Sequence, residues 1–147
     1  MSKLHSKKFD ELTIEQLYAI IRLREEVFVL EQECAYLDAD GLDKEAIHLW
    51  FEQETQIASY CRILPPNTRF LEASIGRVCT QVQFRGKGLA KELLLHAIAA
   101  CEKQYPGQGI SLSSQAHLRQ FYEDLGFSAV SNIYDEDGIP HIKMHKP

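Results

Sequence analysis

The chain has 147 residues, of which 45% are hydrophobic and 25% are charged, a composition typical of a globular protein. No segment approaches the roughly 20 apolar residues that span a bilayer, and the polar start, residues 1–10, lacks the apolar block of a signal peptide. The net charge of −5 argues against a general nucleic-acid-binding protein, which needs basic residues gathered on one face. We therefore expect one cytoplasmic domain, residues 1–147, with no membrane or nucleic-acid partner.

The first half of the chain predicts a helix followed by two strands. Thr13 and Gln16 fit a capping box at the start of the helix. Apolar residues then recur at helical spacing through about four turns, at Ile14, Leu17, Tyr18, Ile21 and Phe28. Apolar runs at 46–51 and 57–64 flank a polar turn and predict a pair of strands, which ends before Pro65.

An acidic, glycine-containing segment lies between this helix and the first of these strands. Its carboxylates are Glu31, Glu33, Asp38, Asp40, Asp43 and Glu45. They either attract a cationic substrate or form an ordinary solvated loop. A calcium loop is excluded, because the glycine comes too early and no glutamate stands at the twelfth position.

The cysteines are widely spaced along the chain, at positions 34, 61, 79 and 101. They form no Cys-x-x-Cys pair and have no histidines clustered around them, so we expect no metal site. Cys101 falls on the apolar side of a predicted helix, where a buried, unreactive thiol is expected.

A glycine-containing turn, residues 83–90, lies between a β-branched run at 74–82 and a helical pattern that continues to residue 101. The apolar stripe of this helix is Leu89, Leu93, Leu94, Ala97, Ile98 and Cys101. Gly86 and Gly88 let the backbone approach an anion, and the amides and dipole of the helix N-terminus favour negative charge there. Lys87 adds a positive charge, so the turn predicts a phosphate site.

The remaining elements complete a mixed α/β fold. A short strand at 109–114 precedes a helix at 116–125, which Gly126 ends. Residues 135–138 resemble a hairpin turn between strands at 129–134 and 139–144. We expect an antiparallel first part and one strand–helix–strand crossover that holds the glycine turn.

The glycine turn fits neither common nucleotide-binding motif. It lacks the Walker pattern, and Lys91 stands where a dinucleotide-binding turn has its third glycine. The turn also follows several strands, whereas a dinucleotide-binding fold places it after the first. A diphosphate-like anion held by main-chain amides remains as the interpretation.

Two segments resemble the GCN5-related N-acetyltransferase (GNAT) family. Gln83-x-x-Gly86-x-Gly88 is similar to its first signature, and residues 115–127 are similar to the second, a helix that carries a tyrosine and ends in Gly-Phe. Further segments, at 28–32, 38–41, 75–78, 115–117 and 137–141, resemble the ElaA-type subgroup. The resemblance implies a central, mostly antiparallel twisted sheet flanked by helices, and transfer of an acetyl group from acetyl-CoA to an amine.

The resemblance also implies roles for individual residues. The pyrophosphate of acetyl-CoA would bind the turn Arg85, Gly86, Lys87, Gly88, Leu89 and Ala90. The pantetheine arm would run along Val78, Cys79 and Thr80, and it would contact Gln115, where the family often has asparagine. Tyr122 matches the family's tyrosine near the sulfur and is expected to protonate the departing thiolate.

The general base is left open among several groups. Candidates are His48, Glu72, Glu33, Glu31 and a relaying water. His117 either lines the cofactor cleft or faces solvent, and His141 is interpreted as a strand residue. Arg62 and Arg77 predict either paired charges or a contact to a substrate carboxylate.

The acceptor is not identified by any motif. A small polyamine or amino metabolite fits the acidic segment, and a protein N-terminus or lysine fits the family. A non-catalytic acyl-CoA sensor or interaction module on the same fold is the alternative to an enzyme. We expect a monomer or a homodimer.

Overall fold

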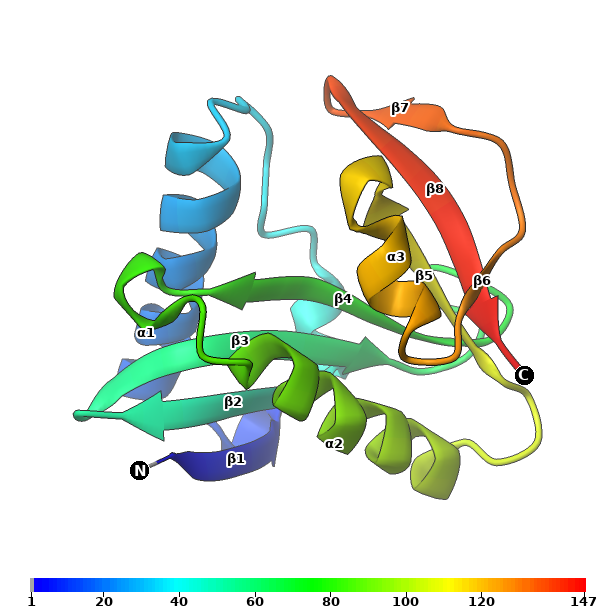
Figure 1. The fold of residues 1–147 in the computed structure, drawn as a ribbon. Helices are drawn as coiled ribbons and strands as arrows, with labels where there is room; N and C mark the ends of the chain where they lie inside the picture. Colours follow the sequence, from blue (N-terminus) through cyan, green and yellow to red (C-terminus); the bar gives the residue numbers. More distant parts are fainter. Residues whose placement is uncertain (1) are drawn as a thin grey trace.

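The computed structural model describes residues 2–147 and shows one twisted sheet with helices packed on it (Figure 1). The strands are β1 (Lys3–Lys8), β2 (Ile47–Gln53), β3 (Gln56–Leu64), β4 (Ala73–Thr80), β5 (Ile110–Gln115), β6 (Ser128–Ala129), β7 (Tyr134–Glu136) and β8 (Ile139–Lys146). The α-helices are α1 (Ile14–Arg24), α2 (Leu89–Gln104) and α3 (Arg119–Glu123). A π-helical segment, Glu25–Glu31, continues α1, and 3-10 turns occur at Phe9–Glu11, Leu42–Glu45, Val82–Phe84 and Ala116–Leu118.

The strand order in the sheet is β1-β2-β3-β4-β5-β8-β6, and β7 pairs with β8. All pairs are antiparallel except β4 and β5, which are parallel and joined through α2. The predicted antiparallel first part and single crossover are therefore confirmed. The β4–β5 pairing is short, since only Ala73 with Ile110 and Ser74 with Ser111 are in register. Beyond these pairs the two strands diverge (Figure 1).

Helix α2 buries the stripe expected from its sequence. Its buried residues are Leu89, Leu93, Leu94, Ala97, Ile98 and Cys101, which pack in the main core with side chains of β2, β3 and β4. Each of these side chains is at most 6% exposed. Burial also raises the pKa of the Cys101 thiol to about 12, so this thiol is an inert core group.

Helix α1 begins as expected but buries a different face. The amide of Gln16 donates to Thr13 Oγ1 at 3.0 Å, which confirms the capping box. Ile14 and Tyr18, however, are 89% and 69% exposed, while Ile20 and Leu23 are buried. The predicted stripe was therefore wrong at Ile14 and Tyr18, whereas Leu17, Ile21 and Phe28 are partly buried and Phe28 packs on the second core. The buried face also includes the charged Arg24, which a hydrophobic pattern does not reveal.

Two strand predictions need correction at the ends of the chain. Strand β1 lies in the polar start, where no strand was predicted, and pairs with β2 as a lysine-rich edge strand. The expected strand at 129–134 is reduced to the short pairs of β6 and β7. The hairpin itself is confirmed, since Asp137 and Gly138 have φ values of +54° and +81°, as a two-residue primed turn requires.

Candidate active site

A cleft opens where β4 and β5 diverge. It is lined by Gly76 and Val78 of β4, Ser113 and Gln115 of β5, and Tyr122 of α3. Because β4 has no strand partner on the β5 side beyond Ser74, the backbone groups of its second half that face β5 make no ladder hydrogen bonds there. The parallel pairing therefore creates the cleft by ending early.

A β-bulge in β4 lies at the same place. Tyr60 of β3 pairs with Cys79, whereas Arg62 pairs with Gly76, so Arg77 and Val78 lie opposite one residue of β3. Arg77 has a φ of +52°, a strained left-handed conformation for a residue other than glycine. The bulge leaves the ladder interrupted next to Val78, and nothing in the local sequence indicated it.

The three residues expected along the pantetheine arm face different surroundings. Val78 lines the cleft. Cys79 is 5% exposed and packs in a second core with Trp50 and Tyr60, and burial raises the pKa of its thiol to about 12. The Thr80 carbonyl accepts a hydrogen bond from Arg85 Nε at 2.9 Å. Cys79 can therefore contribute only through its backbone.

The glycine turn leaves open space at the start of α2. Gly86 and Gly88 have φ values of +79° and +77°, and no heavy atom lies within 4 Å of the position that a Cβ would occupy at either residue. Gly88 is the N-cap of α2 and no side chain caps this helix, so its first-turn amides lack intrahelical partners. These features fit the phosphate site expected from the sequence.

Arg85 fixes the turn through its side chain. Its Nη1 and Nη2 atoms lie 2.8 and 2.7 Å from the Glu31 carboxylate, a bidentate pair between the glycine turn and the end of the π-helical segment. The hydrogen bond from Arg85 holds the pKa of Glu31 below its usual value. Glu31 is thus engaged in positioning the turn and is a poor candidate base.

Tyr122 lies on α3 with its side chain almost fully buried against Phe121 and Phe127, at ring-centroid distances of 5.1 and 6.1 Å. It also lines the cleft. Burial raises the pKa of the Tyr122 phenol above its ordinary value, so it keeps its proton at neutral pH. The phenol is therefore available as a proton donor.

The structure brings neither His48, Glu72 nor Glu33 to the lining of the cleft. His48 is buried, with Nδ1 2.7 Å from Tyr60 Oη and Nε2 3.0 Å from the Asp43 carbonyl, and burial lowers its pKa. Glu72 accepts a hydrogen bond from Ser111, which lowers its pKa. Glu33 is exposed outside the cleft. These three side chains are therefore not positioned to take up a proton in the cleft.

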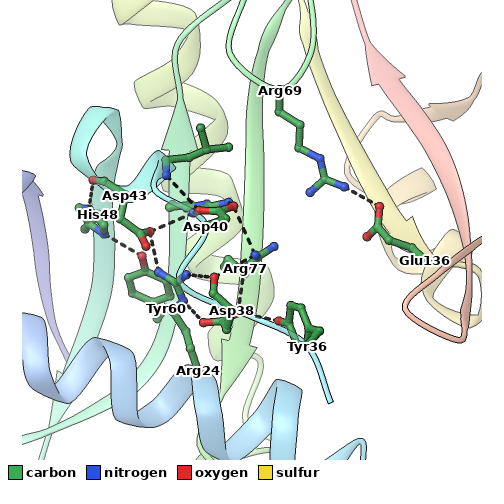
Figure 2. Close-up of polar contacts among 12 residues, drawn as sticks. Arg24, Tyr36, Asp38, Asp40, Asp43, His48, Tyr60, Arg69, Arg77 and Glu136 are labelled. Atoms are coloured by element: carbon green, nitrogen blue, oxygen red, sulfur yellow. Dashed lines mark hydrogen bonds and ion pairs between the residues drawn. The ribbon is translucent and has the colours of Figure 1, made fainter. Parts of the chain in front are cut away.

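The aspartates of the acidic segment are paired with the protein's own arginines (Figure 2). The pairs are Arg24 with Asp38 (2.8 Å) and Asp43 (2.6 Å), Arg62 with Asp40 (2.6 Å) and Asp43 (3.0 Å), and Arg77 with Asp38 (2.9 Å) and Asp40 (3.4 Å). Three guanidinium groups thus match three carboxylates. This confirms the paired-charge interpretation of Arg62 and Arg77, and these aspartates carry no net attraction for a cationic substrate.

This network is expected to make the fold sensitive to acid. Burial alone would raise the pKa of Asp40 and Asp43, but hydrogen bonds and charges from Arg62 and Arg24 hold both below their usual range. A carboxyl with a depressed folded-state pKa stabilises the fold above its unfolded value, about 3.9, and loses that contribution as the pH falls further. Urea unfolding should therefore show a lower free energy of unfolding at pH 3 than at pH 6. In an Asp43→Asn variant, the free energy of unfolding should fall less steeply between pH 6 and pH 3 than in the wild type. An equal fall in both proteins would contradict the stabilising role of the ionised Asp43.

A second polar group lines the cleft and was not anticipated from the sequence. Arg69, in the connection between β3 and β4, pairs with Glu136 of β7 at 2.5 Å (Figure 2). His141 of β8 and Ser113 of β5 lie beside this pair. The group comes from three stretches of the chain, the β3–β4 connection, β5 and the β7–β8 hairpin, so no single local motif marks it.

Three further features of residues 2–147 concern metals, membranes and disulfides. No three His, Cys, Asp or Glu side chains among them gather in a way that could hold a metal ion. Within the same range, no helix has the length and apolar character needed to cross a membrane. All four cysteines are free thiols.

A sheet that opens between two parallel strands, followed by a glycine turn at a helix N-terminus, defines an acyl-CoA N-acyltransferase fold. An acyl-CoA N-acyltransferase from Pseudomonas aeruginosa superposes with a TM-score of 0.95 at 39% identity, and ElaA from Escherichia coli with 0.94 at 35%, each over 100% of both chains. A UPF0039 protein of Synechocystis is 42% identical over 139 residues, which are 94% of this chain and 90% of the relative. Residues 11–147 match the family model described as Acetyltransferase (GNAT) domain. The chain belongs to the GNAT family, and its resemblance to the ElaA-type subgroup is confirmed.

Proposed function

We propose that this protein transfers an acetyl group from acetyl-CoA to a primary amine, by direct attack of the amine in a ternary complex. The observation that carries the proposal is the cleft between β4 and β5, which has unpaired backbone on one wall and the Tyr122 phenol on the other. The uncapped N-terminus of α2 follows β4 directly and supplies the anion site.

Acetyl-CoA would extend from the glycine turn along β4 into the cleft. The main-chain amides from Arg85 to Ala90 would hold the pyrophosphate, because both glycines leave open space where side chains would intrude. Backbone groups of Val78, Cys79 and Thr80 would hold the pantetheine arm, and Gln115 lines the cleft where it can donate from its side-chain amide. Acetyl-CoA supplies the activated thioester.

The protein contributes two kinds of donor to the acetyl transfer. Unpaired amides beside the bulge at Val78 are suited to donate to the thioester oxygen as negative charge develops there. The Tyr122 phenol is suited to donate its proton to the departing sulfur. The balanced aspartate–arginine network gives no preference for polyamines, so the acceptor class is wider than the acidic segment suggested.

The test is calorimetric titration with acetyl-CoA, followed by a thiol-release screen with spermidine, free amino acids and peptides that have a free N-terminus. Tyr122→Phe should bind acetyl-CoA as the wild type does but lose about 100-fold in kcat, since general acid catalysis contributes 10²–10⁴-fold. Tyr105→Phe is the matched control, because Tyr105 ends α2 outside the cleft. Full turnover by Tyr122→Phe would refute the role of Tyr122 as the general acid. Binding of acetyl-CoA without turnover by the wild type would favour an acyl-CoA sensor.

A further inference from the structure

We propose that His141 accepts the proton of the acceptor amine and that Glu136 positions both groups, an inference that rests on the proposed function. His141 is the histidine among the residues that line the cleft. An amine with an ordinary pKa arrives as an ammonium ion and must lose a proton before its nitrogen can attack. A base is therefore needed on the side of the cleft that receives the acceptor.

The strand register places His141 on the wall of the cleft. It lies opposite Gln115 of β5 on one side and Tyr134 of β7 on the other, so these three side chains share one face of the sheet. The rings of Tyr134 and His141 stack at 6.3 Å. His141 is 8% exposed, so its ring is fixed by packing and meets solvent only through the cleft.

A local hydrogen bond determines which ring nitrogen is free. His141 Nδ1 lies 2.7 Å from the carbonyl oxygen of Ile139, and a carbonyl only accepts. Nδ1 therefore carries the proton of the neutral ring, which leaves the lone pair on Nε2. This lone pair lies 3.3 Å from a carboxylate oxygen of Glu136, whose negative charge favours the uptake of a proton by the ring.

Glu136 has its two oxygens assigned to different partners. Oε1 accepts from Arg69 Nη2 at 2.5 Å (Figure 2). It also accepts from Ser113 Oγ at 3.4 Å. Oε2 lies 3.3 Å from His141 Nε2. An ammonium group placed between Oε2 and Nε2 can donate one N–H to each, and the carboxylate stabilises the imidazolium that forms.

The proton steps balance as follows. One N–H bond of the ammonium breaks, the proton bonds to Nε2 of His141, and the electron pair stays on the amine nitrogen to attack the thioester carbonyl. The second proton leaves to water as the C–N bond forms and the C–S bond breaks. Tyr122 protonates the sulfur and is itself reprotonated by water.

Other titratable groups around the cleft are less suited to this role. Burial and a hydrogen bond to Asp38 raise the pKa of Tyr36, so it stays protonated. Glu136 is held by Arg69. The charged and titratable groups that surround the His141 ring are Glu136 and Tyr134 of β7, Lys143 of β8 and, through Glu136, Arg69; β5 contributes the uncharged Gln115 and Ser113.

The experiment compares His141→Gln and Glu136→Gln with the wild type, using the amine that reacts fastest in the screen. His141→Gln should lower kcat/KM about 100-fold at pH 7, and the deficit should shrink toward pH 10, where the amine is itself neutral. Glu136→Gln should raise KM for the amine. Neither variant should change the affinity for acetyl-CoA. His96→Gln is the control, because His96 is exposed on α2, outside the cleft.

The outcomes separate this inference from the proposed function. Wild-type protein without turnover for any amine overturns the function. Turnover with an unchanged pH profile in His141→Gln, or a loss that is equal at every pH, overturns the role of His141 alone. Nitrogen-15 spectra of the histidine rings give an independent readout: the Nδ1–H tautomer of His141 is expected, and the Nε2–H tautomer would overturn the inference without any activity measurement.

Discussion

Replacing Gly86 with glutamate is expected to weaken acetyl-CoA binding at least about 100-fold, roughly 3 kcal/mol. The new side chain meets no heavy atom of the protein, so the fold has room for it. Its carboxylate would instead occupy the open space proposed for the pyrophosphate, and it would place negative charge at the N-terminus of α2. Calorimetric titration of the variant measures the loss.

Gly107→Glu is the matched control for this variant. Gly107 has a φ of +84° and open space around its Cβ position, so the substitution adds the same charge and a similar backbone strain at the opposite end of α2. Thermal unfolding should show similar losses of stability in both variants, whereas only Gly86→Glu should lose affinity for acetyl-CoA. Gly86→Ala adds the backbone strain without the charge, so its affinity for acetyl-CoA shows how much of the loss is due to strain. Equal affinity in Gly86→Glu and wild type would exclude this turn as the pyrophosphate site.

The elements that could be predicted are those with a local signal. The stripe of α2, the capping box at Thr13 and the turn at Gly138 each depend on residues close together in the chain, and all three are confirmed. Strand β1 lacked such a signal, because its polar residues form a sheet edge. The positive φ of Arg77 was equally hidden, since the bulge depends on how β3 and β4 pair.

Only the cofactor side of the candidate active site could be predicted from the sequence. The glycine turn and Tyr122 belong to sequence signatures, and the structure places Tyr122, Val78 and Gln115 on one cleft. The other side depends on contacts between distant residues, such as Arg69 with Glu136, 67 positions apart. A histidine next to a proline gave no indication of a base until the register of β5, β7 and β8 was known. Base candidates chosen for their local context therefore lay outside the cleft.

Replacing Asp43 with asparagine is expected to destabilise the fold by about 3 kcal/mol, because breaking a buried ion pair leaves an uncompensated charge. Asp43 Oδ1 accepts from Arg24 Nη1 at 2.6 Å and from Arg62 Nη1 at 3.0 Å, and both arginine side chains are 1% exposed. Arg62 Nε is already buried without a hydrogen-bond acceptor among residues 2–147. Loss of the Asp43 carboxylate would therefore leave a second nitrogen of the same guanidinium group without its acceptor. Urea unfolding at pH 7 measures the change.

Glu26→Gln serves as the control for the Asp43 variant, because it breaks an exposed ion pair with Arg22 and should cost less than about 1 kcal/mol. Adding Arg24→Met to Asp43→Asn restores the charge balance, so the double variant should be less destabilised than the sum of the single variants. Additive losses, or an Asp43→Asn variant as stable as Glu26→Gln, would show that the network is not held by charge balance.

The network also supports the site, since Arg62 and Arg77 both line the cleft. We therefore expect the destabilised variant to lose affinity for the acceptor before it loses affinity for acetyl-CoA, because the turn proposed to bind the pyrophosphate is held separately by Arg85 and Glu31.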